Sequence, residues 1–172
     1  MRTIVVGCGR VGAGIASRLT EEGHEVTILD TRTEAFRRLD PEFPGQALRG
    51  DGTDQSVLRR AGADGADWFF ALTNGDNRNV LAAQLAHDTF GIPRVLAKIN
   101  DPVRARAYAA LGIDTINRTD MMVGAIERYM GKAGPVGAAD VNVAPEPHGG
   151  ADHMPVSSEA GASPRAEPAG GR

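Results

Sequence analysis

The chain has 172 residues and a formal net charge of -3, with 41% hydrophobic and 24% charged residues. This near-neutral balance excludes a nucleic-acid binder that relies on a general positive field, and it excludes a polybasic membrane anchor. The single cysteine, Cys8, excludes an internal disulfide framework and a cysteine-based zinc site, which favours a cytoplasmic location.

Short β-branched runs alternate with helical stretches along the first part of the chain, and each run closes at a turn signal. The predicted strands are, in chain order, Thr3–Val6, Glu25–Leu29, Gln46–Arg49, Asp67–Leu72, Arg94–Ile99 and Asp114–Asn117. The predicted helices are Val11–Glu22, a weaker one near Arg32–Leu39, Gln55–Ala61, Asn77–Phe90, Val103–Leu111 and Met121–Met130. This α/β alternation predicts a Rossmann-like, doubly wound sheet of six parallel strands with helices on both faces.

The composition changes at Gly131. From there to Arg172 the chain has 8 Gly and 6 Pro among 42 residues, and no Phe, Tyr, Trp, Leu or Ile. Such a segment has too little to bury to offset the conformational entropy of ordering. We therefore expect one folded domain over residues 1–130 and a disordered Gly/Pro/Ala-rich tail over residues 131–172. The tail histidines, His148 and His153, do not predict a metal site.

The first strand leads directly into Gly7-Cys8-Gly9-Arg10-Val11-Gly12, a G-x-G-x-x-G pattern that opens a helix. In this pattern Gly7 permits the tight turn, Gly9 lets backbone approach a diphosphate, and Gly12 allows close packing of helix on strand. The first-turn amides of the helix then point at the anion. The loop therefore predicts a nucleotide phosphate site.

A carboxylate, Asp30, ends the second predicted strand, where an acidic residue can accept hydrogen bonds from both hydroxyls of an adenosine ribose. It would repel the 2′-phosphate of NADP. Thr31 and Arg32 follow it, and the charge of Arg32 could soften that exclusion. The expected ligand is NAD(H) or an adenine nucleotide.

Polar residues follow the later strands at the same edge of the predicted sheet. Asp51 and Thr53 could hydrogen-bond adenine or ribose, and Lys98 supplies a charge suited to phosphate. Local alternatives exist, because Asp54 and Asp76 are also good helix N-caps and Asn74 with Gly75 is a turn dipeptide. The candidate cofactor-binding residues are Gly7, Cys8, Gly9, Arg10, Val11, Gly12, Asp30, Thr31, Arg32, Asp51, Gly52, Thr53, Thr73, Asn74 and Lys98.

No acid or base for hydride transfer is recognisable beside this site. Tyr108 and Tyr129 lack the lysine four residues later that short-chain dehydrogenases use. Cys8 is either a small residue that fills the tight turn or a thiol activated by the helix amides. The sequence therefore predicts no catalytic residues and a ligand sensor in place of an enzyme.

Together these stretches resemble the nucleotide-binding (RCK/KTN, TrkA-N-type) domain of the regulator-of-potassium-conductance family, as in Trk/Ktr potassium-uptake regulatory proteins. The resemblance covers Met1 to Met130 and rests on Ile4-Val5-Val6-Gly7-Cys8-Gly9-Arg10-Val11-Gly12, Asp30, Gly50-Asp51-Gly52-Thr53, Thr73 with Asp76 and Asn79, Ala97-Lys98-Ile99-Asn100-Asp101-Pro102, and Leu111-Gly112-Ile113-Asp114. Two departures stand out: the chain passes into the tail where relatives often continue into a second small domain, and it has Asn117-Arg118 where the family tends to have proline.

The resemblance implies a cytosolic regulatory subunit that binds NAD(H) or ATP/ADP and gates a membrane potassium transporter without chemical turnover. It places the protein at the inner face of the plasma membrane through that transporter, with no nucleic-acid partner. By the same resemblance the three glycines hold phosphates, Asp30 the ribose, Asp51 and Thr53 the adenosine, and Lys98 takes the place of the usual arginine near phosphate.

The last predicted helix follows Thr119, a plausible N-cap, and carries Met122, Ile126 and Met130 at positions i, i+4 and i+8. This stripe indicates either core packing or a subunit interface, and the resemblance implies a homo-oligomer, dimer or ring, through this region. Two other functions stay open. One is a small NAD-dependent oxidoreductase completed by a partner or by dimerisation, and the other is an interaction module that binds no nucleotide.

Overall fold

The computed structural model describes residues 1–132 and 141–142, which form an α/β fold around one sheet with the strand order β3-β2-β1-β4-β5-β6-β7. Six strands pair in parallel, which confirms the predicted architecture: β1 (Arg2–Val6), β2 (Glu25–Asp30), β3 (Gln46–Arg49), β4 (Trp68–Ala71), β5 (Arg94–Lys98) and β6 (Asp114–Ile116). A two-residue strand that was not predicted, β7 (Val141–Asn142), pairs antiparallel with β6. Residues 133–140 and 143–172 of the predicted disordered tail lie outside the described residues.

Every predicted helix is present, with ends shifted by a few residues. The helices are α1 (Arg10–Glu21), α2 (Gln55–Arg60), α3 (Asp76–Gln84), α4 (Pro102–Ala109) and α5 (Arg118–Tyr129), with 3-10 turns η1 (Thr33–Arg38) and η2 (Ala63–Gly65). The weak helix predicted near Arg32–Leu39 is the 3-10 turn η1. The end of the helix predicted at Asn77–Phe90 widens into a π-helical turn, η3 (Leu85–Thr89).

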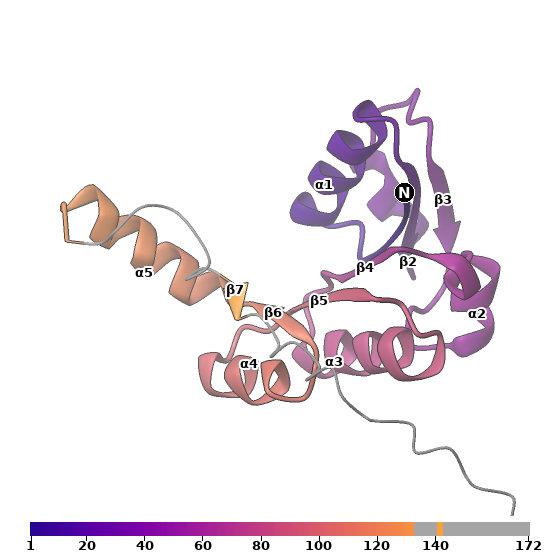
Figure 1. Ribbon diagram of the computed structural model, residues 1–172. Helices are drawn as coiled ribbons and strands as arrows, with labels where there is room; N and C mark the ends of the chain where they lie inside the picture. Colours follow the sequence, from indigo (N-terminus) through magenta and orange to yellow (C-terminus); the bar gives the residue numbers. More distant parts are fainter. Residues whose placement is uncertain (133–140, 143–172) are drawn as a thin grey trace, which may run out of the picture.

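The sheet is covered on both faces, with α1 on one side and α2, α3 and α4 on the other (Figure 1). Along β1, Val5 packs with α1 residues such as Leu19, whereas Ile4 packs with Leu58 of α2 and with residues of α3. This alternation explains why the continuous apolar run of β1 is buried at every position from Thr3 to Val6. The rigid two-sided core fixes where the carboxyl ends of β1, β2, β4 and β5 lie.

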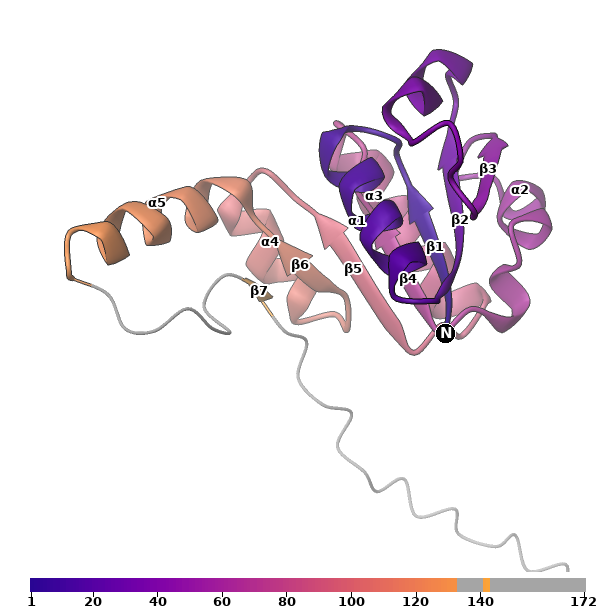
Figure 2. The same ribbon diagram turned by 90° about the horizontal axis from the view of Figure 1, so that it is seen from above.

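The last helix, α5, lies apart from this core. It extends away from the sheet beyond β6 in both views (Figures 1 and 2), and none of its residues is buried. Met122, Ile126 and Met130 are 60%, 56% and 55% exposed. The core-packing interpretation of this stripe is therefore wrong for the chain as described.

The cap of α5 also differs from the prediction. Asn117, not Thr119, is the N-cap, and its side-chain oxygen accepts a hydrogen bond from the Asp120 amide at 3.0 Å. Thr119 lies one residue inside the helix. Asn117 prevails because its buried amide nitrogen also donates to the carbonyls of Ile99 and Asn100, both at 2.8 Å, which a threonine could not do. Within residues 1–132 and 141–142, no helix combines the length and apolar character needed to cross a membrane.

Candidate functional site

The glycine loop lies between the end of β1 and the start of α1, and each glycine has a different steric environment. Gly7 has a φ of +103°, and a Cβ there would lie 2.9 Å from the Thr73 backbone nitrogen. A Cβ on Gly12 would collide with the carbonyl oxygen of Gly7. A Cβ on Gly9 would meet nothing within 4 Å. The loop is thus closed on the protein side and open at Gly9, where a ligand can approach the backbone.

The start of α1 is suited to an anion. Its N-cap, Gly9, offers no side-chain hydrogen bond, and its first turn contains no acidic residue. Arg10 and Val11 are exposed there. Because the first amides of a helix lack intrahelical partners, they are free to donate to a phosphate.

Asp30, the last residue of β2, reaches back to the glycine loop. One carboxylate oxygen accepts a hydrogen bond from the Cys8 amide at 3.0 Å, and the other accepts from the Arg32 amide at 2.9 Å. The Arg32 Nε lies 3.8 Å from the carboxylate, whose side chain is 12% exposed. A carboxylate offers about four lone-pair directions, so Asp30 can hold the loop and still accept from ribose hydroxyls. Thr31 is exposed beside it.

Cys8 is fully buried, and its thiol donates to the carbonyl of Ala35 at 3.3 Å. Burial raises the pKa of this thiol, the Asp30 charge raises it further, and Arg38 only partly opposes them. The alternative of a thiol activated by helix amides is therefore wrong, because the side chain points into the α1 core. Cys8 fills the turn, and only its backbone amide can take part in a site.

The loop after β3 is folded by its own side chains. The Asp51 carboxylate accepts hydrogen bonds from the Thr53 amide at 3.0 Å and from the Thr53 hydroxyl at 2.8 Å. Gly52 between them is buried against Val6. Asp54 caps α2 as expected, accepting from the Ser56 and Val57 amides. Asp51 and Thr53 are exposed or half-buried at the strand end next to Asp30, within the candidate edge.

The end of β4 is tied to the end of β5 by Asn79, which is fully buried. Its side-chain oxygen accepts from the Thr73 amide at 2.9 Å and from the Thr73 hydroxyl at 2.6 Å. Its nitrogen donates to the Lys98 carbonyl at 2.7 Å. Asn79 therefore positions two predicted site residues without being one itself. Asn74 is exposed in the turn beside them.

Asp76 has a role that differs from both sequence interpretations, a helix N-cap and a residue of the ligand site. The N-cap of α3 is Gly75, and Asp76 is the first residue of the helix. Its carboxylate accepts hydrogen bonds from the Asn100 amide at 3.0 Å and the Asn100 side chain at 2.8 Å, and from the Asp101 amide at 3.3 Å. Burial acts to raise the pKa of Asp76, but these hydrogen bonds and Arg104 hold it below its ordinary value. Asp76 fixes the loop after β5 and is not a cap of its own helix.

Lys98, at the end of β5, is half-buried. Burial lowers its pKa, the nearby charge of Arg118 lowers it further, and Asp76 acts in the opposite direction. Arg118 is not among the candidate site residues predicted from the sequence. The structure brings this second cation close to Lys98.

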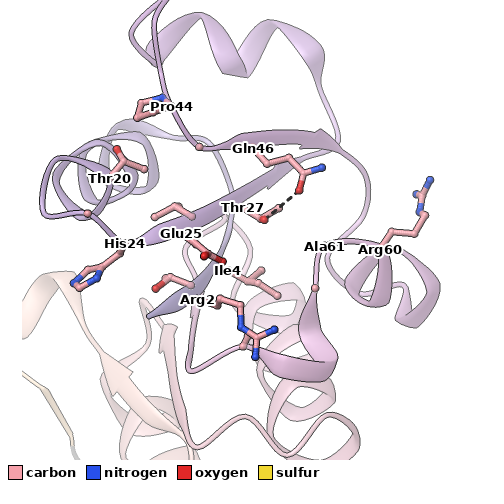
Figure 3. Close-up of a pocket in the computed structure, with 16 residues that line it drawn as sticks. Arg2, Ile4, Thr20, His24, Glu25, Thr27, Pro44, Gln46, Arg60 and Ala61 are labelled. Atoms are coloured by element: carbon pink, nitrogen blue, oxygen red, sulfur yellow. Dashed lines mark hydrogen bonds between the residues drawn. The ribbon is translucent and has the colours of Figure 1, made fainter.

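A hollow of about 510 Å³ lies at the opposite, amino edge of the sheet (Figure 3). Arg2, Glu25, Thr27 and Gln46 are among the residues that line it, and Thr27 donates to Gln46 at 3.3 Å. None of the predicted site residues lines this hollow. Ligands of open parallel sheets bind outside the carboxyl ends of the strands, so we place the candidate site at the glycine loop. Among residues 1–132 and 141–142, no three His, Cys, Asp or Glu side chains are grouped to hold a metal ion.

Comparison with known proteins places this geometry in a family. The family model described as the TrkA-N domain matches residues 3–119. The chain is 44% identical over 116 residues to the "Trk system potassium uptake protein TrkA" of Streptomyces coelicolor, covering 67% of this chain and 52% of that protein. The chain thus spans about half the length of that relative.

Solved structures share the fold at low sequence identity. The AMP-bound Kef C-terminal domain of Shewanella denitrificans superposes with a TM-score of 0.65 at 21% identity, covering 76% of this chain and 79% of that one. The GsuK channel bound to NAD superposes with a TM-score of 0.60 at 18% identity, covering 76% of this chain and 23% of that one. These likenesses confirm the Rossmann-like architecture.

Proposed function

The chain belongs to the TrkA-N domain family, and from this premise we propose that it is a cytosolic regulatory subunit of a potassium-uptake system that binds NAD(H) or ATP/ADP. Binding would gate a membrane potassium transporter without chemical turnover. The relative from Streptomyces coelicolor carries the name of a Trk potassium uptake protein, and two proteins of the same fold are described with AMP and with NAD. These names support the proposal.

The observation that carries the proposal is the pairing of Asp30 with the glycine loop. The carboxylate holds the Cys8 amide at 3.0 Å, while Gly9 leaves open space on the ligand side. An adenosine ribose would then lie against Asp30 and its phosphates against the α1 amides. Because Asp30 is a carboxylate, a 2′-phosphate would be repelled, which favours NAD(H), ATP or ADP over NADP(H).

The absence of turnover is supported by where the histidine and tyrosine side chains of residues 1–132 lie. His24 precedes β2, His87 is in the turn before β5, and Tyr108 is near the end of α4 before β6. Each therefore lies toward the amino edge of the parallel sheet, opposite the glycine loop. Tyr129, near the end of α5, is 93% exposed. An oxidoreductase acting at the glycine loop would need an acid or base other than these histidines and tyrosines.

A regulatory subunit needs a partner surface and two states. The exposed apolar stripe of α5, Met122, Ile126 and Met130, would provide the contact between copies in a homo-oligomer. A nucleotide shifts such an assembly only by binding one of its states more tightly than the other. The transporter would hold the assembly at the inner face of the plasma membrane.

The test is potassium uptake by the native cell after deletion of the gene for this chain. We expect impaired uptake of a rubidium tracer, restored by the wild-type gene and not by a gene encoding Asp30→Ala at equal protein level. The matched control is Asp64→Ala, an exposed carboxylate outside the candidate edge. Unchanged uptake in the deleted strain, or full rescue by Asp30→Ala, would contradict the proposal.

A further inference from the structure

Two cations flank the ends of β5 and β6. Lys98 is the last residue of β5 and pairs in register with Ile116 of β6. Arg118 follows two residues later as the first residue of α5. Asn117 between them donates to the Ile99 and Asn100 carbonyls at 2.8 Å, so the start of α5 is fixed against the end of β5.

Neither cation forms an ion pair with a carboxylate of the described chain (residues 1–132 and 141–142). Asp76 is near enough to act on the Lys98 charge, but its oxygens accept hydrogen bonds from the Asn100 and Asp101 amides. Arg118 meanwhile disfavours the charged form of Lys98, which is already disfavoured by burial. Two like charges near each other, neither of them ion-paired to a carboxylate, would be stabilised by an added anion.

We propose that Lys98 and Arg118 together bind the terminal phosphate of a nucleoside triphosphate whose first phosphates lie on the glycine loop. This proposal rests on the proposed function and names ATP as the preferred ligand of the site. Arg118 is its new element, because the sequence did not place it among the candidate site residues.

The order of the strands shows how far the two cations lie from the glycine loop. β4 separates β1 from β5, and β6 follows. Neighbouring strands lie about 4.8 Å apart, so the glycine loop and Lys98 are separated by about two strand spacings. A phosphate chain that starts at Gly9 and runs along the carboxyl edge of the sheet would come within reach of the long side chains of Lys98 and Arg118.

NAD would present a different group at this place. Beyond its diphosphate it carries a nicotinamide riboside, and the oxidised ring is positively charged. Two adjacent cations disfavour a positive ring and favour a phosphate that carries negative charge. We therefore expect the affinity order ATP, ADP, AMP, with NAD weaker than ATP.

The experiment is calorimetric titration of the full chain, freed of bound nucleotide, with AMP, ADP, ATP and NAD. Arg118→Gln should weaken ATP binding roughly tenfold, since it removes one charge-assisted hydrogen bond, and should leave AMP binding unchanged. Lys98→Gln should weaken ATP binding roughly tenfold and AMP binding by less. The matched control is Arg106→Gln, which removes an exposed charge from the last turn of α4. Circular dichroism of each variant shows whether the fold is retained.

The titration with AMP distinguishes a failure of this inference from a failure of the proposed function. If AMP and ATP bind but the ATP to AMP ratio is the same in wild type and in both variants, the cation pair is not a phosphate site and the nucleotide function stands. If the folded chain binds no nucleotide, both are overturned. Loss of ATP preference in Arg118→Gln and not in Arg106→Gln supports the assignment.

Discussion

The carboxylate of Asp30 accepts a hydrogen bond from the backbone amide of Cys8 at 3.0 Å, which joins the end of β2 to the glycine loop after β1. The residue predicted to bind ribose is therefore also the residue that shapes the phosphate loop. A change at Asp30 would therefore act on both the ribose part and the phosphate part of the proposed site. The glycines of the loop offer cleaner tests, because their steric environments differ.

Gly12→Ala should strongly destabilise the fold. The new Cβ would collide with the Gly7 carbonyl, a backbone atom that can move only with the loop. We expect a loss of about 2–4 kcal/mol in the free energy of unfolding, measured by urea denaturation. The matched control is Gly14→Ala on the same helix, where a Cβ meets nothing within 4 Å. That change should stabilise the protein by about 0.5–1 kcal/mol, and equal stability of the two variants would contradict the packing role of Gly12.

Gly9→Ala separates folding from binding. A Cβ at Gly9 is free of the protein but occupies the space through which a diphosphate would approach the backbone. The free energy of unfolding should fall by only about 1 kcal/mol, because alanine is a poorer N-cap than glycine, while nucleotide affinity falls at least tenfold. The Gly14→Ala variant should bind normally. Undiminished binding by Gly9→Ala would place the phosphates elsewhere.

The sheet and the local chemistry of the glycine loop could be predicted from the sequence, because both depend on residues that are close in the chain. The alternation of strands predicted the six parallel strands, and the G-x-G-x-x-G spacing placed Gly7, Gly9 and Gly12 where each has its own steric role. The roles that were missed depend on distant pairs. Asp76 binds Asn100, which lies 24 residues further along the chain, and Asn79 reaches the Lys98 carbonyl across 19 residues. A local pattern predicts helix caps, not such contacts.

The end of the domain was also predicted incompletely, for a physical reason. Periodicity shows that α5 has an apolar stripe, but it does not show whether the helix packs on its own sheet. Thr119 was a reasonable cap by residue type, yet Asn117 is held in place by the carbonyls of Ile99 and Asn100. The sequence shows Arg118 only as an irregularity, whereas in the structure its charge lowers the pKa of Lys98.

Cys8 predicts a specific pH dependence. Burial, and then the Asp30 charge, raise its pKa above the ordinary 9.0, so the folded state favours the neutral thiol. This contribution to stability is present below the pKa of the unfolded chain and is lost as the pH rises through the folded value. Urea denaturation from pH 7 to 10.5 should show stability falling above about pH 9. The fall should be smaller in Cys8→Ala, and identical profiles for the two proteins would contradict the burial argument.

The exposed stripe of α5 predicts the oligomeric state. Wild type should be a dimer or larger by light scattering, and Ile126→Asp should be a folded monomer, because a charge in an apolar interface lacks a partner. The control is Val103→Asp, which changes a residue of α4 that is 67% exposed. A monomeric wild type, or an oligomer unaffected by Ile126→Asp, would contradict the interface.

The most direct test of the account is calorimetric titration of the nucleotide-free chain with NAD, NADH, NADPH, ATP and ADP, beside Asp30→Asn and Asp30→Ala. Asparagine keeps an oxygen that can accept from the Cys8 amide, so Asp30→Asn preserves the loop better than alanine does. The account predicts binding of NAD(H) or ATP/ADP by wild type, poor binding of NADPH, and weaker binding in both variants. If the folded protein binds none of these nucleotides, the account is contradicted, and the glycine loop is then a structural turn.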